Sequence, residues 1–226
     1  MRMKFLAPIA ALALAAGLGT AAQAATTVTS TFATGAEGWK FGSYQGGSTD
    51  VTWDSATQTI AKINHGFNGW GFLASTAYLG DKSAFLNGSF SFDLSDNQPS
   101  QQYATRPALV LTGANGKTIF AKGLGLPGPN LSNFDISLKA SSFYTGSPTN
   151  QLGSVSSADF AAILADLEQV QIWADWTPNV ETVRLDNVKM AVNTGVPEPA
   201  TWALMIMGFG AAGVTLRRRR TGLAAA

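Results

Sequence analysis

Short runs of alternating or β-branched residues, each closed within a few positions by Gly, Asn, Pro or Ser, restrict most strongly how this chain can fold. Runs of this kind are typical of short strands. They lie at residues 57–63, 88–94, 107–113, 117–123, 134–139, 170–176 and 182–190. Between the third and fourth runs, Asn115-Gly116 is the strongest short hairpin signal. The sequence therefore predicts an all-β sandwich or barrel.

One segment predicts a helix instead, from Ser156 to about Glu168. Ser156 and Asp159 resemble a capping box, with Asp in place of the usual Glu. Apolar side chains then recur at i, i+3, i+4 and i+7, at Phe160, Ile163, Leu164 and Leu167. We expect this helix to pack over one edge or end of the sandwich.

The first residues predict an export signal. Arg2 and Lys4 precede an almost entirely apolar stretch at residues 5–18, and Ala-Gln-Ala ends at Ala24 as a small-residue cleavage site. We expect signal peptidase to remove residues 1–24. The chain contains no cysteine, so an exported domain of about 170 residues must depend on its hydrophobic core rather than on disulfides.

The charge of the body argues against one class of partner. Between Ala25 and Val196 there are 9 Lys and Arg side chains and 13 Asp and Glu side chains, a net charge of −4. Affinity for nucleic acid depends on neutralising phosphates, so a mildly acidic body without a basic cluster predicts no nucleic-acid partner.

The C-terminal region predicts a membrane segment. Residues 200–216 carry no charge, and as a helix these 17 positions span about 25 Å, marginal for a hydrocarbon layer of roughly 30 Å. A cluster of basic side chains follows, which predicts a cytoplasmic end with the body outside the inner membrane; it consists of Arg217, Arg218, Arg219 and Arg220. Before this segment, Pro197 and Pro199 favour an extended chain, as expected of a linker or of a protease substrate.

The order of these parts resembles a known sorting signal. Residues 196–226 combine a Pro-Glu-Pro motif, an apolar segment and an arginine cluster, and are similar to the PEP-CTERM signal of Gram-negative bacteria in its PEPxxWA variant. The positions that match the motif are Pro197, Glu198, Pro199 and Trp202. The resemblance implies an exosortase as processing enzyme and release of the body to the cell surface or exopolysaccharide matrix. These four residues would then be substrate, not catalyst.

The body carries a second resemblance, which covers about residues 30–192. The segments 30–39 (STFATGAEGW) and 184–190 (RLDNVKM) look like the first and last strands of carbohydrate-binding-module-like jelly rolls. Residues 69–94 are similar to the laminin B (laminin IV) domain. The segment 157–172, with the later Leu-Asp-Asn-Val at residues 185–188, also fits that family. The resemblance implies that residues 25–195 form one jelly-roll domain whose first and last strands meet.

Some jelly rolls of this kind hold a structural calcium ion near the chain termini. The candidate ligands here are Glu37 and Asp186. Relatives often carry an acid directly after the position of Phe32, whereas this chain has Ala33. The sequence therefore favours a solvated surface role for Glu37, and we expect no cofactor.

The inventory of catalytic groups is small. His65 is the only histidine, no Gly-x-Ser-x-Gly motif occurs, and a histidine-based metal site is excluded. A glycosidase needs two carboxylates held about 5 to 9 Å apart. The pairs Asp93 with Asp96 and Asp175 with Asp186 are interpreted as ordinary surface acids. We therefore expect no enzymatic activity.

Aromatic residues suggest a binding role. Trp39, Phe72 and Trp173 are expected in the core, whereas Trp53 and Trp70 stand beside Asp, Asn and Gly and are candidates for stacking on sugar rings. The leading hypothesis is an exported, non-enzymatic protein of the cell surface or biofilm matrix, engaged in adhesion or polysaccharide contact. A carbohydrate-active hydrolase or lyase and a purely structural matrix component remain the alternatives.

Overall fold

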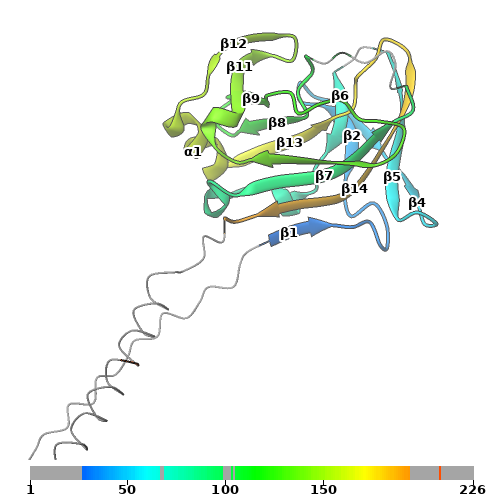
Figure 1. Cartoon of the computed structure of the whole chain (residues 1–226), viewed down its shortest axis with the longest axis horizontal. Helices are drawn as coiled ribbons and strands as arrows, with labels where there is room; N and C mark the ends of the chain where they lie inside the picture. The colour runs from blue at the N-terminus through cyan, green and yellow to red at the C-terminus, as the bar shows by residue number, and fades with distance from the viewer. Residues whose placement is uncertain (1–26, 67–68, 99–102, 104, 194–208, 210–226) are drawn as a thin grey trace, which may run out of the picture.

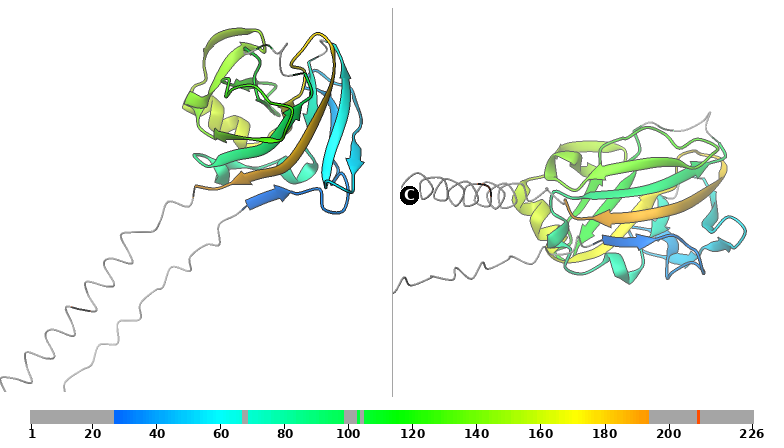
Figure 2. Two further views of the ribbon diagram at one scale, coloured as in Figure 1. Left: turned by 45° about the vertical axis from the view of Figure 1, so that its right-hand side comes forward. Right: turned by 60° about the horizontal axis from the view of Figure 1, so that its bottom comes forward.

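The computed structural model describes residues 27–66, 69–98, 103, 105–193 and 209, and it contains two antiparallel β-sheets packed face to face (Figures 1 and 2). The six-stranded sheet, called sheet A, has the order β10 (Ser132–Ser137), β7 (Ser89–Asp96), β14 (Val180–Ala191), β5 (Thr59–His65) and β4 (Thr52–Asp54), and β1 (Thr27–Ser30) also pairs with β14. The eight-stranded sheet, called sheet B, has the order β12 (Asn150–Ser154), β11 (Phe143–Ser147), β9 (Thr118–Ala121), β8 (Leu109–Gly113), β13 (Leu167–Trp173), β6 (Trp70–Leu73), β2 (Lys40–Ser43) and β3 (Ser48–Asp50).

The predicted all-β sandwich with one short helix is confirmed, and each of the seven predicted runs contributes a strand. Helix α1 (Ser157–Ala165) begins where expected, since the Ser156 hydroxyl oxygen accepts a hydrogen bond from the Asp159 backbone N–H at 3.0 Å. It ends earlier than predicted, because Leu167 already belongs to β13. Three single-turn 3₁₀ helices complete the described elements: η1 (Thr76–Tyr78), η2 (Ser83–Phe85) and η4 (Ala140–Ser142).

Strand β14 is the centre of sheet A. It pairs with β7 along one edge and with β5 and then β1 along the other. The predicted meeting of the first and last strands is confirmed, because Thr27 stands opposite Ala191. Phe32, Trp39, Leu185 and Val188 are buried as expected. The Tyr78 hydroxyl fixes this region by donating to the Val188 carbonyl at 3.0 Å.

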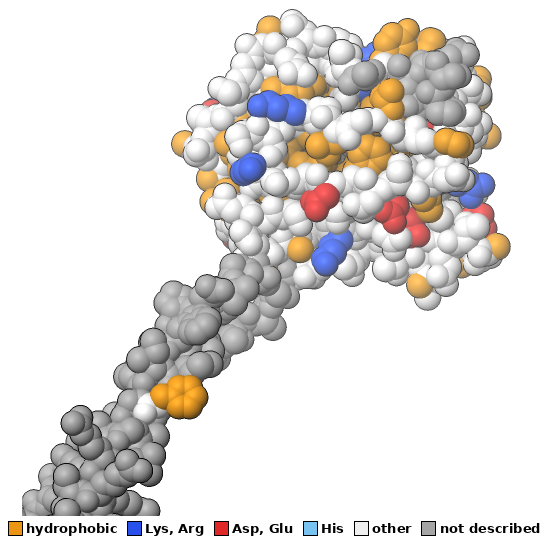
Figure 3. All heavy atoms as spheres, viewed as in Figure 1, with side chains coloured by type: hydrophobic (Ala, Val, Ile, Leu, Met, Phe, Trp, Pro, Cys, Tyr) orange, Lys and Arg blue, Asp and Glu red, His pale blue; other side chains and the backbone are white. Residues whose placement is uncertain are grey.

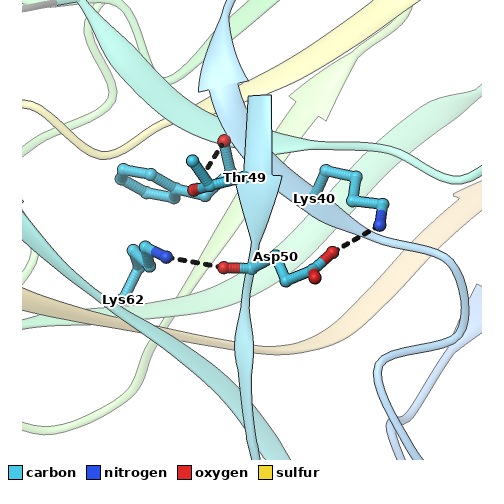
Figure 4. Close-up of polar contacts among 5 residues, drawn as sticks. Lys40, Thr49, Asp50 and Lys62 are labelled. Atoms are coloured by element: carbon cyan, nitrogen blue, oxygen red, sulfur yellow. Dashed lines mark hydrogen bonds and ion pairs between the residues drawn. The ribbon is translucent and has the colours of Figure 1, made fainter. Parts of the chain in front are cut away.

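The chain passes from sheet B to sheet A between β3 and β4, and a set of polar contacts fixes this corner (Figure 4). The Lys40 ammonium pairs with the Asp50 carboxylate, and the Lys62 ammonium donates to the Asp50 carbonyl at 2.6 Å. Lys62 belongs to sheet A and Lys40 to sheet B, so the two lysines join the sheets through one residue. On the face shown in Figure 3, charged side chains stand apart on a mostly neutral surface.

The core between the sheets is built from large aromatic side chains. Trp39, Phe72 and Trp173 are each at most 1% exposed, so their predicted burial is confirmed. Trp39 and Tyr78 meet edge to face with ring centroids 5.3 Å apart. Within the part of the chain that the structure describes, no helix is both long and apolar enough to cross a membrane. The membrane segment predicted at residues 200–216 lies outside the described residues, apart from Phe209.

Candidate functional site

A pocket of about 350 Å³ opens at the end of the sandwich where β14 begins. Its lining comes from the turn after β2, the start of β6, the approach to β8, the β11–β12 turn and the end of β13: Tyr44, Gln45, Gly69, Arg106, Ser147, Pro148, Thr149, Trp173 and Asp175. Backbone, hydroxyl and amide groups thus surround two aromatic rings, with one cation and one anion. Such a lining offers many hydrogen-bonding groups to a polar ligand.

Two glutamines of β13 position the turns that form the pocket. The Gln169 side-chain amide donates to the Ser43 carbonyl at 3.2 Å, and the Gln171 amide donates to the Gly69 carbonyl at 2.9 Å. Gln171 is fully buried, and its side-chain oxygen has no hydrogen-bond partner among the described residues. The role of Gln171 at the pocket is therefore to hold Gly69 in place from behind, since Gln171 itself does not line it.

The aromatic walls are fixed by ring contacts. Tyr44 meets Phe120 edge to face at 5.5 Å, and Phe120 stacks on Tyr144 at 5.6 Å. Burial raises the pKa of Tyr144 to about 12, although the nearby positive charge of Arg106 lowers that pKa. The Tyr144 hydroxyl therefore keeps its proton at neutral pH. The Arg106 guanidinium lies 6.0 Å from the Trp173 ring centroid. The rings are therefore held in place before any ligand arrives, which lowers the entropic cost of binding.

Behind the pocket lies a cluster of buried polar side chains that consists of Asn64, Asp96, Asp175 and Glu181, none more than 1% exposed. Asp175 reaches the pocket, and its Oδ2 accepts from the Gly69 backbone N–H at 2.6 Å. Glu181 Oε1 accepts from the Trp176 backbone N–H at 3.0 Å. The prediction that Asp96 and Asp175 are surface acids is wrong, because turn residues and strand ends cover both, a closure that sequence spacing does not reveal.

The surroundings of Glu181 favour its protonated, uncharged form. Burial raises its pKa to about 8; the hydrogen bond from Asn64 opposes this rise, and the charge and hydrogen bonding of Asp96 add to it.

Comparison with known families identifies the body. The model of the laminin B (domain IV) family matches residues 71–203. The chain belongs to the laminin B (domain IV) family. The model of the PEP-CTERM protein-sorting motif matches residues 195–220, so the tail marks an exported protein that is anchored in the membrane before processing. No curated protein matches the sequence.

One solved laminin structure supports the fold, and two further solved structures are more distantly similar. The L4b domain of human laminin alpha-2 is 14% identical, with 68% of this chain and 90% of that chain covered and a TM-score of 0.57. The family 11 carbohydrate-binding module of Lic26A-Cel5E from Clostridium thermocellum is 16% identical over 77% of this chain and 90% of that chain, with a TM-score of 0.41. The N-terminal cellulose-binding domain of a Cellulomonas fimi β-1,4-glucanase is 15% identical over 71% and 93%, with a TM-score of 0.38.

The two tryptophans expected to contact glycan lie on different sheets of the laminin B domain, and neither lines the pocket. Trp53 on β4 is 37% exposed, and its indole N–H donates to the Phe32 carbonyl at 2.8 Å. Trp70 on β6 is half-buried, directly after the pocket residue Gly69, and its ring lies 6.0 Å from that of Phe41. Sequence reasoning missed Tyr44 as a pocket residue.

The candidate calcium ligands lie near one another in the laminin B domain. Burial, together with the charges of Asp93 and Glu37, raises the pKa of Asp186. The neighbouring carboxylate, that of Asp93, accepts hydrogen bonds from two side-chain amides. Asn133 donates to one oxygen at 2.9 Å and Asn187 to the other at 2.8 Å. Among the described side chains, no group of three or more His, Cys, Asp or Glu could hold a metal ion. A calcium ion here would therefore need main-chain oxygens as further ligands.

The remaining predicted residues have simple outcomes. His65 is the last residue of β5 and is exposed, as expected of a strand-end residue. Several predicted positions lie outside the described residues: the cleavage site at Ala24, the motif residues Pro197, Glu198, Pro199 and Trp202, and the cluster Arg217, Arg218, Arg219 and Arg220.

Proposed function

We propose that this protein is an exosortase-processed component of the cell surface or exopolysaccharide matrix, and that its laminin B jelly roll contacts polysaccharide without catalysing a reaction. The observation that carries the proposal is the pocket at the start of β14, where the half-buried ring of Tyr44 lies among neutral hydroxyl and amide groups. Sugars present both apolar C–H faces and hydroxyl groups, so they suit such a lining.

The charges at the pocket favour a neutral polymer. Arg106 and Asp175 contribute one charge of each sign to the lining, and the body around them has a net charge of −4. A polyanionic chain would meet a repulsive field on approach, whereas a neutral glycan would not. A single small site is expected to bind weakly, because association entropy offsets much of the contact energy. Many copies on one polymer would then supply useful avidity.

The rival hydrolase or lyase hypothesis has less support from the geometry. A glycosidase needs an acid and a second carboxylate that both reach the substrate. Here Asp175 reaches the pocket, but its two oxygens accept hydrogen bonds from Asn64 and Gly69. The raised pKa of Glu181 would suit a general acid, but Glu181 does not line the pocket.

The test separates binding from catalysis on the same polymers. The full chain, solubilised in detergent, is run through native gels containing neutral or acidic polysaccharides, and reducing ends are measured after incubation with each polymer. We expect retardation by at least one neutral polymer without new reducing ends. New reducing ends would support the hydrolase instead, and free migration in every gel would leave a purely structural component.

A further inference from the structure

The two ends of the described body lie side by side. Thr27 stands opposite Ala191 and Val28 opposite Met190 in the β1–β14 pair. Figures 1 and 2 show both ends of the coloured ribbon at the same end of the sandwich. The chain therefore enters and leaves the domain at one place, which we call the tail end.

The pocket lies at the opposite end of the same strand. Asn64 links the pocket residue Asp175 to Glu181, the second residue of β14, while Ala191 is its last. Ten residue steps at about 3.3 Å each separate Glu181 from Ala191 by at most about 33 Å, since an irregularity between Asp186 and Lys189 shortens the strand. The tail end and the pocket thus face away from each other along the length of sheet A.

The tether between the tail end and the sorting signal is short. Four residue steps connect Asn193, the last residue of the continuous described body, to Pro197. Even a fully extended chain covers at most about 14 Å in four steps. The uncharged segment begins three residues after Pro197, so an anchored body cannot move far from the membrane surface.

The surface of the tail end suits contact with lipid headgroups. Leu86 is 41% exposed and lines a cavity of about 320 Å³ together with Lys139, whose side chain is exposed. Gly88 packs so closely on the Ala191 carbonyl that a Cβ there would lie 2.1 Å from the oxygen, which places this surface beside the exit of the tail. Lys189 is also exposed, two residues before the end of β14. Lysines beside an exposed leucine fit an anionic lipid surface.

We infer that, while the tail anchors the precursor, the body rests on the membrane through the tail-end surface formed by Leu86, Lys139 and Lys189, with anionic lipid headgroups as its partner. The pocket then faces away from the membrane, so that its ligand is accessible before release. The inference depends on the matched sorting tail and not on polysaccharide contact, and the two can fail separately.

The absence of cysteine from the chain allows a clean test with single labels. Leu86→Cys at the tail end and Val180→Cys at the start of β14 replace two exposed apolar residues, 41% and 53% exposed. Each full-length variant is labelled with a fluorophore and reconstituted into vesicles containing phosphatidylglycerol, with a nitroxide quencher on the lipid headgroups. We expect quenching several-fold stronger at position 86 than at position 180.

Two further conditions test the partner. Lys139→Glu with Lys189→Glu, or high salt, should reduce the quenching at position 86, because a lysine contact with anionic lipid is screened. Equal quenching at positions 86 and 180 would overturn the inference, as would failure of the chain to stay in carbonate-washed vesicles. Quenching that appears only after an exosortase is added to the vesicles would assign the tail end to a protein partner and also overturn it.

Discussion

The side-chain amide of Asn64 lies between two buried carboxyl groups, 3.1 Å from Glu181 Oε1 and 3.3 Å from Asp175 Oδ1. One amide nitrogen thus donates both to a residue of strand β14, Glu181, and to a residue that lines the pocket, Asp175. Because Asp96 is also buried beside Glu181, three acids share one end of the sandwich, and this crowding favours the protonated form of Glu181.

This arrangement predicts a loss of stability at alkaline pH. The pKa of Glu181 is about 8 in the folded state and 4.5 ordinarily, so between these values the folded state binds more protons than the unfolded chain. The free energy of unfolding therefore falls as pH rises through this window, and the loss is complete above about pH 8. We expect the melting temperature of the full chain to fall by about 5 °C or more between pH 6 and pH 9.

The matched variant is Glu181→Gln, which keeps the shape and the acceptor for Asn64 but removes the titration. Its melting temperature is expected to vary much less over the same range and to exceed that of the parent chain at pH 9. Parallel curves for the two proteins, measured by near-ultraviolet circular dichroism, would show that Glu181 does not cause the pH dependence.

The pocket predicts which aromatic residue carries polysaccharide contact. Tyr44→Ala removes a half-buried ring from the lining, so it should weaken retention on the polymer by about tenfold, the equivalent of about 1.4 kcal/mol. Trp70→Ala is expected to weaken retention less, because Trp70 is next to the lining but not in it. Affinity electrophoresis measures both effects.

Controls separate contact from folding. Tyr44→Phe keeps the ring without the hydroxyl and reports which of the two matters. Trp53→Ala should lower the melting temperature by a few degrees while retention persists, because its indole N–H bonds to the Phe32 carbonyl in the segment that follows β1. Loss of retention in Trp53→Ala alone, with the fold intact, would move the contact to that edge.

Sequence patterns predicted the strands that bury alternating side chains, including β7, where Phe90, Phe92 and Leu94 point inward. They missed β2 (Lys40–Ser43) and β6 (Trp70–Leu73), four-residue strands that each contain a glycine. Gly42 and Gly71 are nevertheless required, since a Cβ at either position would lie 2.2 and 2.1 Å from a backbone oxygen. Such close approach depends on tertiary packing, which a local pattern does not record.

The pocket could not be predicted for a related reason. Tyr44 and Asp175 are far apart in the chain and meet only because β2, β6 and β13 are neighbours in sheet B. Alternation indicates that a side chain faces one side of a strand, but not whether a turn covers it. Asp96 and Asp175 therefore looked like surface acids although both are buried.

Calcium is expected to leave stability unchanged. The Asp93 carboxylate is already served by two side-chain amides, and Asp186 Oδ1 accepts from the Asn187 backbone N–H at 2.7 Å, so few carboxylate oxygens remain for a cation. The measurement is the melting temperature of the full chain in millimolar calcium and in chelator. A rise of several degrees with calcium, lost in Asp186→Asn, would show that main-chain oxygens complete a site with Glu37 and Asp186.

Processing is expected to depend on the Pro-Glu-Pro motif. Glu198 is the one charged residue between Lys189 and Arg217, and the flanking Pro197 and Pro199 favour an extended chain, which suits a protease substrate. Replacing all three motif residues with alanine should leave a longer membrane form in place of the shorter released form, as seen by immunoblotting of membrane and released fractions.

The control variant is Thr194→Ala with Val196→Ala, which alters the same tether outside the motif and should be released normally. Both changes lie after β14, which ends at Ala191, so we expect the melting temperatures to agree. Normal release of the triple variant would mean that the tail is a plain anchor and that the Pro-Glu-Pro residues are not recognised.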